Sequence, residues 1–126
     1  MRFLIDTHVL IWHFEDDAQL TLERSAFIDD PDNEPLVSFA SLWEIAIKQS
    51  LDKLKLSSSL DNIVGAIEES TTSLLPIDSR HLIRVAELQF HRKDPFDRLI
   101  IAQALAENIP IITSDPHFAA YGVALL

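Results

Sequence analysis

The sequence predicts an α/β protein built on a central, mainly parallel sheet of about four to five strands. Short apolar runs alternate with amphipathic stretches along the whole chain, which is the pattern of repeated strand–helix–strand units. The chain has 126 residues, 48% of them hydrophobic, so it is long enough for one domain with a core and too short for two of ordinary size. We therefore expect a single domain spanning residues 1–126.

Each expected element follows from a local pattern. The expected strands are the apolar runs at residues 3–5, 36–37, 74–75, 109–112 and 123–126. The expected helices are the amphipathic stretches near 18–29, 41–54, 60–70, 79–89 and 95–107, and another helix should begin after Asp6. Only two glycines, Gly65 and Gly122, occur, so neither a glycine-rich phosphate loop nor a dinucleotide fingerprint can form.

The composition limits the class of function. A formal charge of -10 argues against broad, nonspecific binding of nucleic acid. Half of the ten basic residues lie between Arg80 and Arg98, where they form either a local cationic rim or ordinary solvated helix faces. The chain has no cysteine, so a metal site must use oxygen or imidazole ligands, and a cytoplasmic location is favoured. The sequence predicts neither a signal peptide nor a membrane-spanning segment.

Two carboxylates follow expected strands. Asp6 comes directly after residues 3–5, and Asp115 comes shortly after residues 109–112. In open α/β sheets ligands bind at the carboxyl edge, because the loops there converge on one crevice. Each residue has an alternative interpretation as an ordinary helix cap, and Pro116 after Asp115 is typical of the start of a short helix.

Two further carboxylates lie near expected helix starts. Ser41 and Glu44 have the spacing of a capping box, and Glu44 also precedes Lys48 by four residues, which favours a helix pair. Asp94 is typical of a cap before Pro95, whereas Asp97 heads the apolar stripe of the following helix and should lean inward. A carboxylate in that position requires a partner, which a shared cation would provide.

Together, Asp6, Glu44, Asp97 and Asp115 should converge at one edge of the sheet. Carboxylates so close to one another cannot all stay ionised without cations, and oxygen ligands suit Mg²⁺ or Mn²⁺. Two such ions about 4 Å apart can support hydrolysis of a phosphodiester. The histidines lack zinc spacing, no nucleophile elbow is present, and His91 beside Arg92 and Lys93 is either a phosphate contact or a surface histidine without a role.

The segments 4–12, 41–48, 91–104 and 113–115 together resemble a PIN-domain protein of the VapC toxin type. The resemblance spans nearly the whole chain. It implies a three-layer α/β/α fold, a Mg²⁺- or Mn²⁺-dependent endoribonuclease, and inhibition by a cognate antitoxin protein, and we expect a homodimer as well. The family's four acids fall on Asp6, Glu44, Asp97 and Asp115.

The resemblance also implies roles within this set. Asp6 and Asp97 would hold the principal metal, Asp115 would support it or a second ion, and Glu44 would orient or deprotonate the attacking water. Thr7 or Thr113 would provide hydroxyl support. Asp97 is preferred as the third acid because it heads the apolar stripe, and whether Asp94 joins or replaces it as a ligand stays open. The remaining members of the expected site are the RNA-contact candidates His91, Arg92, Lys93 and Arg98.

The sequence leaves three other functions open. A receiver-like signalling domain also gathers acids and Mg²⁺ at the carboxyl edge of a parallel sheet. Asp78 or Asp6 would then be the candidate phosphoacceptor, although Asp78 is followed by no matching set of receiver residues. A catalytically silent interaction module would use the four acids only as caps. A DNA-cutting relative of the same fold is the third. Trp12, Phe14 and Trp43 are candidates either for a dimer surface or for the core.

Overall fold

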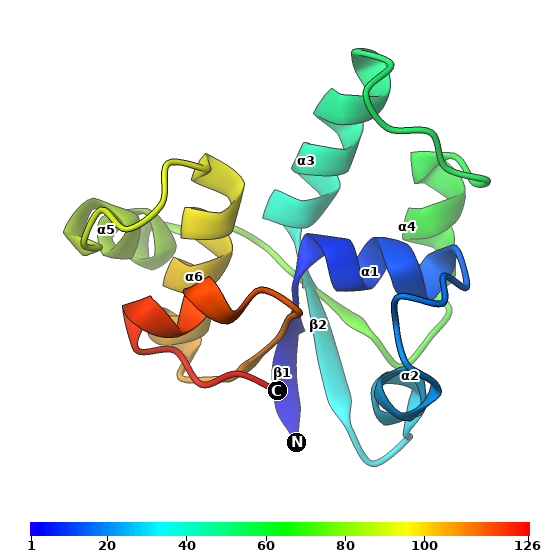
Figure 1. Cartoon of the computed structure of the whole chain (residues 1–126), viewed down its shortest axis with the longest axis horizontal. Coiled ribbons are helices and arrows are strands. Elements are labelled where there is room, and N and C mark those ends of the chain that lie inside the picture. The colour runs from blue at the N-terminus through cyan, green and yellow to red at the C-terminus, as the bar shows by residue number, and fades with distance from the viewer.

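The computed structural model describes all residues, 1–126, and contains four strands and seven helices. Figure 1 shows their arrangement. In chain order they are β1 (Arg2–Ile5), α1 (Thr7–Phe14), α2 (Leu22–Asp29), β2 (Glu34–Ser38), α3 (Phe39–Ser50), α4 (Leu60–Glu68), β3 (Ser73–Leu75), α5 (Ser79–Glu87), α6 (Pro95–Glu107), β4 (Ile111–Ile112) and the 3₁₀ helix η1 (Pro116–Tyr121).

The four strands form one sheet in the order β3-β2-β1-β4, and every pairing is parallel. In the centre of the sheet Leu4 lies between Leu36 of β2 and Ile111 of β4. This confirms the predicted parallel sheet. The expected fifth strand at 123–126 is reduced to one parallel bridge between Ile111 and Leu125.

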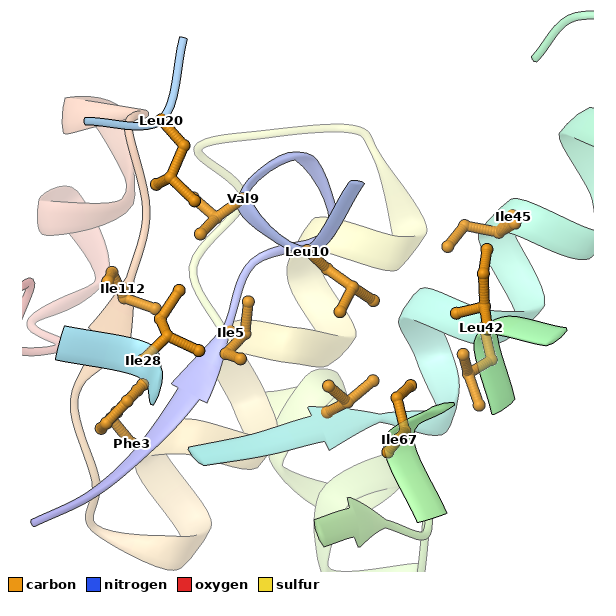
Figure 2. Packing of buried hydrophobic residues seen from close by; sticks show 12 residues of the cluster. Phe3, Ile5, Val9, Leu10, Leu20, Ile28, Leu42, Ile45, Ile67 and Ile112 are labelled. Carbon is orange, nitrogen blue, oxygen red and sulfur yellow. The ribbon is translucent and has the colours of Figure 1, made fainter. Parts of the chain in front are cut away.

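Side chains alternate across the sheet and divide the core into two clusters. Phe3, Ile5 and Val37 belong to one cluster, which α1, α2, α3 and α4 complete (Figure 2). Leu4 and Leu36 belong to the other, which is completed mainly by α6 and η1. Each large apolar side chain buried in these clusters contributes about 1.5–3 kcal/mol to folding. Helices therefore cover both faces of the sheet, and the three-layer α/β/α expectation is confirmed.

Local capping explains where the helices differ from their expected bounds. The helix expected near residue 18 begins at Leu22, because the Thr21 side chain accepts a hydrogen bond from the Arg24 amide. The helix expected near 41 begins at Phe39, because Ser38 accepts a hydrogen bond from the Ala40 amide. It ends at Ser50, shortly before Asp52 adopts a φ of 55°. None of the helices combines the length and apolar character needed to span a membrane.

Candidate active site

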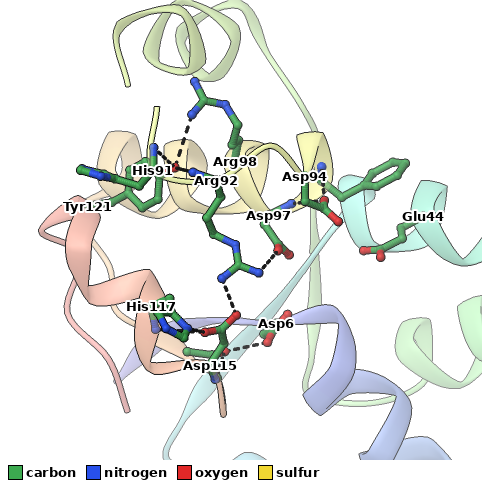
Figure 3. Close-up of polar contacts among 12 residues, drawn as sticks. Asp6, Glu44, His91, Arg92, Asp94, Asp97, Arg98, Asp115, His117 and Tyr121 are labelled. Carbon is green, nitrogen blue, oxygen red and sulfur yellow. Dashed lines mark hydrogen bonds and ion pairs between the residues drawn. The ribbon is translucent and has the colours of Figure 1, made fainter. Parts of the chain in front are cut away.

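The carboxyl ends of β1 and β4 bring the first and the last predicted acid together. The two strands are parallel neighbours, so Asp6 and the segment after Ile112 emerge at the same edge. Thr113 Oγ1 donates a hydrogen bond to Asp6 Oδ2 over 2.6 Å and accepts one from the Asp115 amide over 3.0 Å. One hydroxyl thus links the two acids, as Figure 3 shows in part.

Asp6 is enclosed and does not act as a side-chain cap. It occupies the N-cap position of α1, but its carboxylate makes no capping hydrogen bond, and only 3% of the residue is exposed. Its Oδ1 has no hydrogen-bond partner. Burial raises the pKa of Asp6, and the hydrogen bond from Thr113 offsets only part of that shift. The amides of Thr7 and His8 also act to lower the pKa of Asp6, but neither makes a capping hydrogen bond to its side chain, and one buried carboxylate oxygen is without a partner.

Asp94 and Asp97 have different roles at the start of α6. Asp94 Oδ1 accepts hydrogen bonds from the amides of Phe96 and Asp97 over 2.8 and 3.0 Å, with Pro95 in the first helical turn, as the sequence predicts for a cap. The Asp97 side chain is 14% exposed. Burial, reinforced by the charges of Asp94 and Asp6, raises the pKa of Asp97 to about 6. Asp97 therefore shares its electrostatic surroundings with Asp6.

Glu44 lies inside α3 and not in a capping box. Because Ser38 already caps this helix, the alternative interpretation of Ser41 and Glu44 as a capping box is wrong. Glu44 is 3% exposed, and its Oε2 accepts a hydrogen bond from Lys48 Nζ at 2.6 Å, which confirms the predicted helix pair. That bond raises the pKa of Lys48. Glu44 Oε1 is buried and has no partner.

Figure 3 shows Glu44, Asp94, Asp97 and Asp6 facing a common region from α3, α6 and the end of β1. Their mutual influence agrees with this view, since the charge of Glu44 also contributes to the raised pKa of Asp97. Asp115 lies on the opposite side of this region from Glu44. The fold thus brings the four predicted acids, and Asp94 with them, to one edge of the sheet.

Asp115 is the most solvated of the four acids. It caps η1 by accepting a hydrogen bond from the His117 amide over 3.0 Å, which confirms the predicted cap. Its side chain is 28% exposed and also contacts the His117 ring at 3.1 Å. Burial opposes the shift, but the hydrogen bonds from His117 and the charge of Arg92 lower the pKa of Asp115. This carboxylate is stabilised in its ionised form.

Arg92 bridges the acids of two elements. Its Nη2 lies 3.2 Å from Asp97 Oδ2, and its Nη1 lies 2.7 Å from Asp115 Oδ2. The guanidinium carbon lies 5.6 Å from the centre of the Phe118 ring. Arg92 therefore faces the acids and is an internal counterion of the cluster in this structure.

Arg98 corrects one of the predicted RNA contacts. The residue is only 9% exposed, and its guanidinium donates to the backbone carbonyls of Gln89 and Val85 over 3.0 and 3.3 Å. It also lies 4.7 Å over the Phe90 ring. Its guanidinium binds groups inside the protein and points away from the acids (Figure 3). Arg98 therefore stabilises the packing of the fold, and its position does not suit a contact with RNA.

Tyr121 is a site-supporting residue that sequence reasoning missed. Its hydroxyl accepts hydrogen bonds from the amides of His91 and Arg92 over 3.1 and 2.8 Å, and the His91 ring packs edge-on against its ring. It is the only tyrosine of the chain, and a single aromatic residue has no spacing pattern that would identify it. Tyr121 thus links residues 91–92 to η1.

An open cavity of about 700 Å³ lies between this basic segment and η1. It is lined mainly by His91, Arg92, Lys93, Asp94, Pro116 and His117.

The two predicted hydroxyl supports occupy different places. Thr113 contacts Asp6, as described above. Thr7 Oγ1 instead donates to Ser41 Oγ over 2.8 Å in a buried contact, which joins α1 to α3. Thr113 therefore orients a carboxylate directly, whereas Thr7 positions the helix that carries Glu44.

The donor set suits a hard divalent cation, although the side chains are not gathered around one. No three Asp, Glu or His side chains are arranged closely enough to hold a metal ion in this structure. Lys48 and Arg92 engage several of the carboxylates instead. Nevertheless, two buried carboxylate oxygens lack partners, and all the candidate acids offer oxygen ligands. These residues fit Mg²⁺ or Mn²⁺ chemistry by their donor type and by their uncompensated charge.

The amino-acid sequence was compared with protein-family profiles and with curated proteins. The sequence profile described as the PIN domain matches residues 3–124. A search of curated proteins found no match to the chain.

Solved structures share the fold over nearly their whole length. A chain of VapBC2 from Rickettsia felis, determined with a DNA fragment from its promoter, aligns with a TM-score of 0.75 at 16% identity and covers 100% of this chain and 98% of its own. VapBC-1 from nontypeable Haemophilus influenzae gives a TM-score of 0.70 at 19% identity, with coverage of 100% and 97%. VapBC-5 from Mycobacterium tuberculosis, a member of the VapBC family of toxin–antitoxin systems, gives 0.61 at 22% identity, with coverage of 99% and 95%.

Proposed function

The chain belongs to the PIN domain family, and from that premise we propose that it is a Mg²⁺- or Mn²⁺-dependent endoribonuclease acting as the toxin of a toxin–antitoxin pair. One observation carries the proposal. Asp6 Oδ1 and Glu44 Oε1 are buried without partners, beside Asp97, whose pKa is raised to about 6. A cation that binds these carboxylates would remove this cost of burial, so the arrangement favours metal-dependent chemistry over a set of caps.

Asp6 and Asp97 would hold the principal metal, and Asp115 would support it or a second ion. When bound, the metal would lower the pKa of a water ligand and offset charge that develops on the phosphate. Thr113 holds one oxygen of Asp6 and leaves the other free. Asp94 is engaged through Oδ1 as the cap of α6, so we give it the weaker role of adding negative charge beside Asp97.

Glu44 would orient the attacking water or accept its proton. Lys48 Nζ holds Glu44 Oε2 at 2.6 Å, while Oε1 remains without a partner. A fixed carboxylate with one free oxygen is what a general base requires, because the water must meet it at hydrogen-bond distance. His91, Arg92 and Lys93 border the open cavity beside the acids, where they would contact the phosphates of RNA.

The test of the metal site is Asp6→Asn. It should abolish Mn²⁺-dependent RNA cleavage and leave the circular dichroism spectrum unchanged, because it removes a ligand and no capping bond. Asp61→Asn is the matched control, since Asp61 is an exposed acid in the first turn of α4. Full residual activity of Asp6→Asn would exclude the mechanism. Parallel assays with RNA and DNA decide between an RNA-cutting and a DNA-cutting enzyme.

The two rival functions lose support at specific residues. Asp78, the candidate phosphoacceptor of a receiver-like domain, caps α5 and pairs with Arg80 at 2.9 Å. A silent interaction module would use its acids as caps, yet neither Asp6 nor Glu44 makes a capping hydrogen bond with its side chain. A calorimetric titration that detects no binding of Mn²⁺ would favour the silent module.

Partner binding is part of the same proposal. The proteins of similar structure include toxin–antitoxin complexes, and we propose a cognate antitoxin, a homodimer and a cytoplasmic location here. Trp43 is 54% exposed and packs edge-on against Phe96, next to the site, whereas Trp12 and Phe14 pack against the core. A short, basic, DNA-binding-like protein encoded beside this chain would support the antitoxin proposal, and light scattering would test the dimer.

A further inference from the structure

The bridge formed by Arg92 occupies the space where two of the candidate ligands meet. Separate nitrogens of one guanidinium reach Asp97 Oδ2 at 3.2 Å and Asp115 Oδ2 at 2.7 Å. Figure 3 shows the Arg92 side chain extending between these carboxylates. An arginine and a divalent ion compete for the same oxygens, because both require the negative charge of the ionised carboxylates.

Arg92 compensates the acidic cluster only in part. Asp6 Oδ1 and Glu44 Oε1 remain without partners. The negative charge that remains therefore favours a cation of higher charge than one guanidinium.

The Arg92 side chain can leave the acids without disturbing its own backbone. The Arg92 amide donates to the Tyr121 hydroxyl over 2.8 Å, so the segment stays tied to η1 when the side chain moves. The side chain is 28% exposed and borders the open cavity beside His91 and Lys93. Rotation about its own bonds would carry the guanidinium toward that cavity, where a polynucleotide phosphate would lie in the proposed reaction.

We propose that Arg92 is a displaceable internal cation, which neutralises Asp97 and Asp115 in the metal-free protein and releases both carboxylates when Mg²⁺ or Mn²⁺ binds. The freed guanidinium then binds a phosphate of the substrate through paired hydrogen bonds, a geometry that arginine provides and lysine does not. The inference rests on the proposed metal-dependent nuclease function and adds to it a residue that couples metal binding to substrate binding.

The first test is calorimetric titration of Mn²⁺ into metal-free protein without RNA. Arg92→Gln should bind Mn²⁺ about tenfold more tightly than wild type, because the competing cation is gone. Lys93→Gln is the matched control: it removes the same charge one residue away, from an exposed side chain with no ion pair among those in the structure. Unchanged or weaker binding by Arg92→Gln would overturn the proposal, as would equal tightening in Lys93→Gln.

The second test measures RNA cleavage at saturating Mn²⁺. Arg92→Gln should lower kcat/KM about tenfold or more even though its metal affinity has risen. A merely structural defect would lower both quantities, so the opposite signs identify the proposed role. Arg92→Lys provides the conservative comparison if Arg92→Gln fails to fold. Lysine has a single nitrogen, whereas Arg92 reaches Asp97 and Asp115 with two separate nitrogens. Arg92→Lys should therefore hold the two carboxylates less firmly and also bind Mn²⁺ more tightly than wild type, and failure to do so would overturn the proposal.

The outcomes separate the two levels of the proposal. If wild type neither binds Mn²⁺ nor cleaves RNA, the proposed function fails and the inference about Arg92 fails with it. If wild type does both and Arg92→Gln shows unchanged metal affinity, only the inference about Arg92 fails.

Discussion

The acidic cluster has an inner part and an outer part that compensate their charge differently. The inner acids, Asp6, Glu44 and Asp97, lie among buried surroundings. Lys48 and Arg92 pair with Glu44 and Asp97, but Asp6 and Glu44 each keep one oxygen without a partner. The outer acid, Asp115, is more exposed and is hydrogen-bonded to His117 and paired with Arg92. The same chemical group is therefore held at a cost in one place and stabilised in the other. Carboxylates held at such a cost are enriched at functional sites.

The largest expected effect concerns an inner acid and the reaction itself. Glu44→Gln should lower RNA cleavage about 100- to 1000-fold, because the amide keeps the shape of the side chain but cannot accept a proton. Glu68→Gln, at the exposed end of α4, is the matched control and should keep full activity. Measured rates for Glu44→Gln within twofold of wild type would remove Glu44 from the reaction.

The second effect concerns stability and sharpens the contrast between the two parts. Because the pKa of Asp97 is raised to about 6, the folded protein binds this proton more tightly than the unfolded chain does. The ionised group thus costs folding free energy above about pH 4, and the cost reaches about 2–3 kcal/mol once the pH exceeds the folded pKa. In EDTA at pH 7.5, Asp97→Asn should raise the free energy of unfolding by about 2 kcal/mol.

Urea denaturation of metal-free wild type and Asp97→Asn at pH 7.5 and pH 4 measures this effect. The gain should shrink toward zero at pH 4, where the wild-type carboxyl is protonated in the folded state. A variant that is no more stable than wild type at pH 7.5 would show that the inner part is not under electrostatic strain.

The smallest effect should have the opposite sign. The lowered pKa of Asp115 means that its ionised form stabilises the fold above the unfolded pKa, and that this contribution is lost as the pH falls through the folded value. Asp115→Asn should therefore lower the free energy of unfolding at pH 7.5 by about 0.5–1 kcal/mol, since an exposed pair is partly screened. The same urea titration, repeated at high salt, should show a smaller loss. Stabilisation by this variant would remove the contrast with Asp97.

Sequence reasoning was most successful where a residue's role depends on its neighbours in the chain. Asp94 caps α6 and Asp115 caps η1 as expected, because the following prolines mark the first turns of these helices. The bounds of α6 at Pro95–Glu107 agree with the expected 95–107 for the same reason. The pair between Glu44 and Lys48 also follows from helical spacing alone.

It failed where a competing partner lies elsewhere in the fold. Ser38 ends β2 and caps α3, and this displaces the capping box expected at Ser41 and Glu44. Arg98 is a basic residue in the segment expected to contact RNA, but its guanidinium binds the carbonyls of Gln89 and Val85 inside the protein. Charge and spacing in the sequence do not reveal such contacts, because they depend on how a helix is rotated against its neighbours.

The sequence by itself determined the parallel α/β organisation, the positions of Asp6 and Asp115 after strands, and those of Asp94 and Asp97 at the start of a helix. Periodicity and turn residues encode these features locally. Only the tertiary structure decided that Asp6 and Glu44 are buried with one free oxygen each, and that Arg92 spans Asp97 and Asp115. Burial and ion pairing depend on segments far apart in the chain, and it is the parallel pairing of β1 with β4 that brings Asp6 to Thr113.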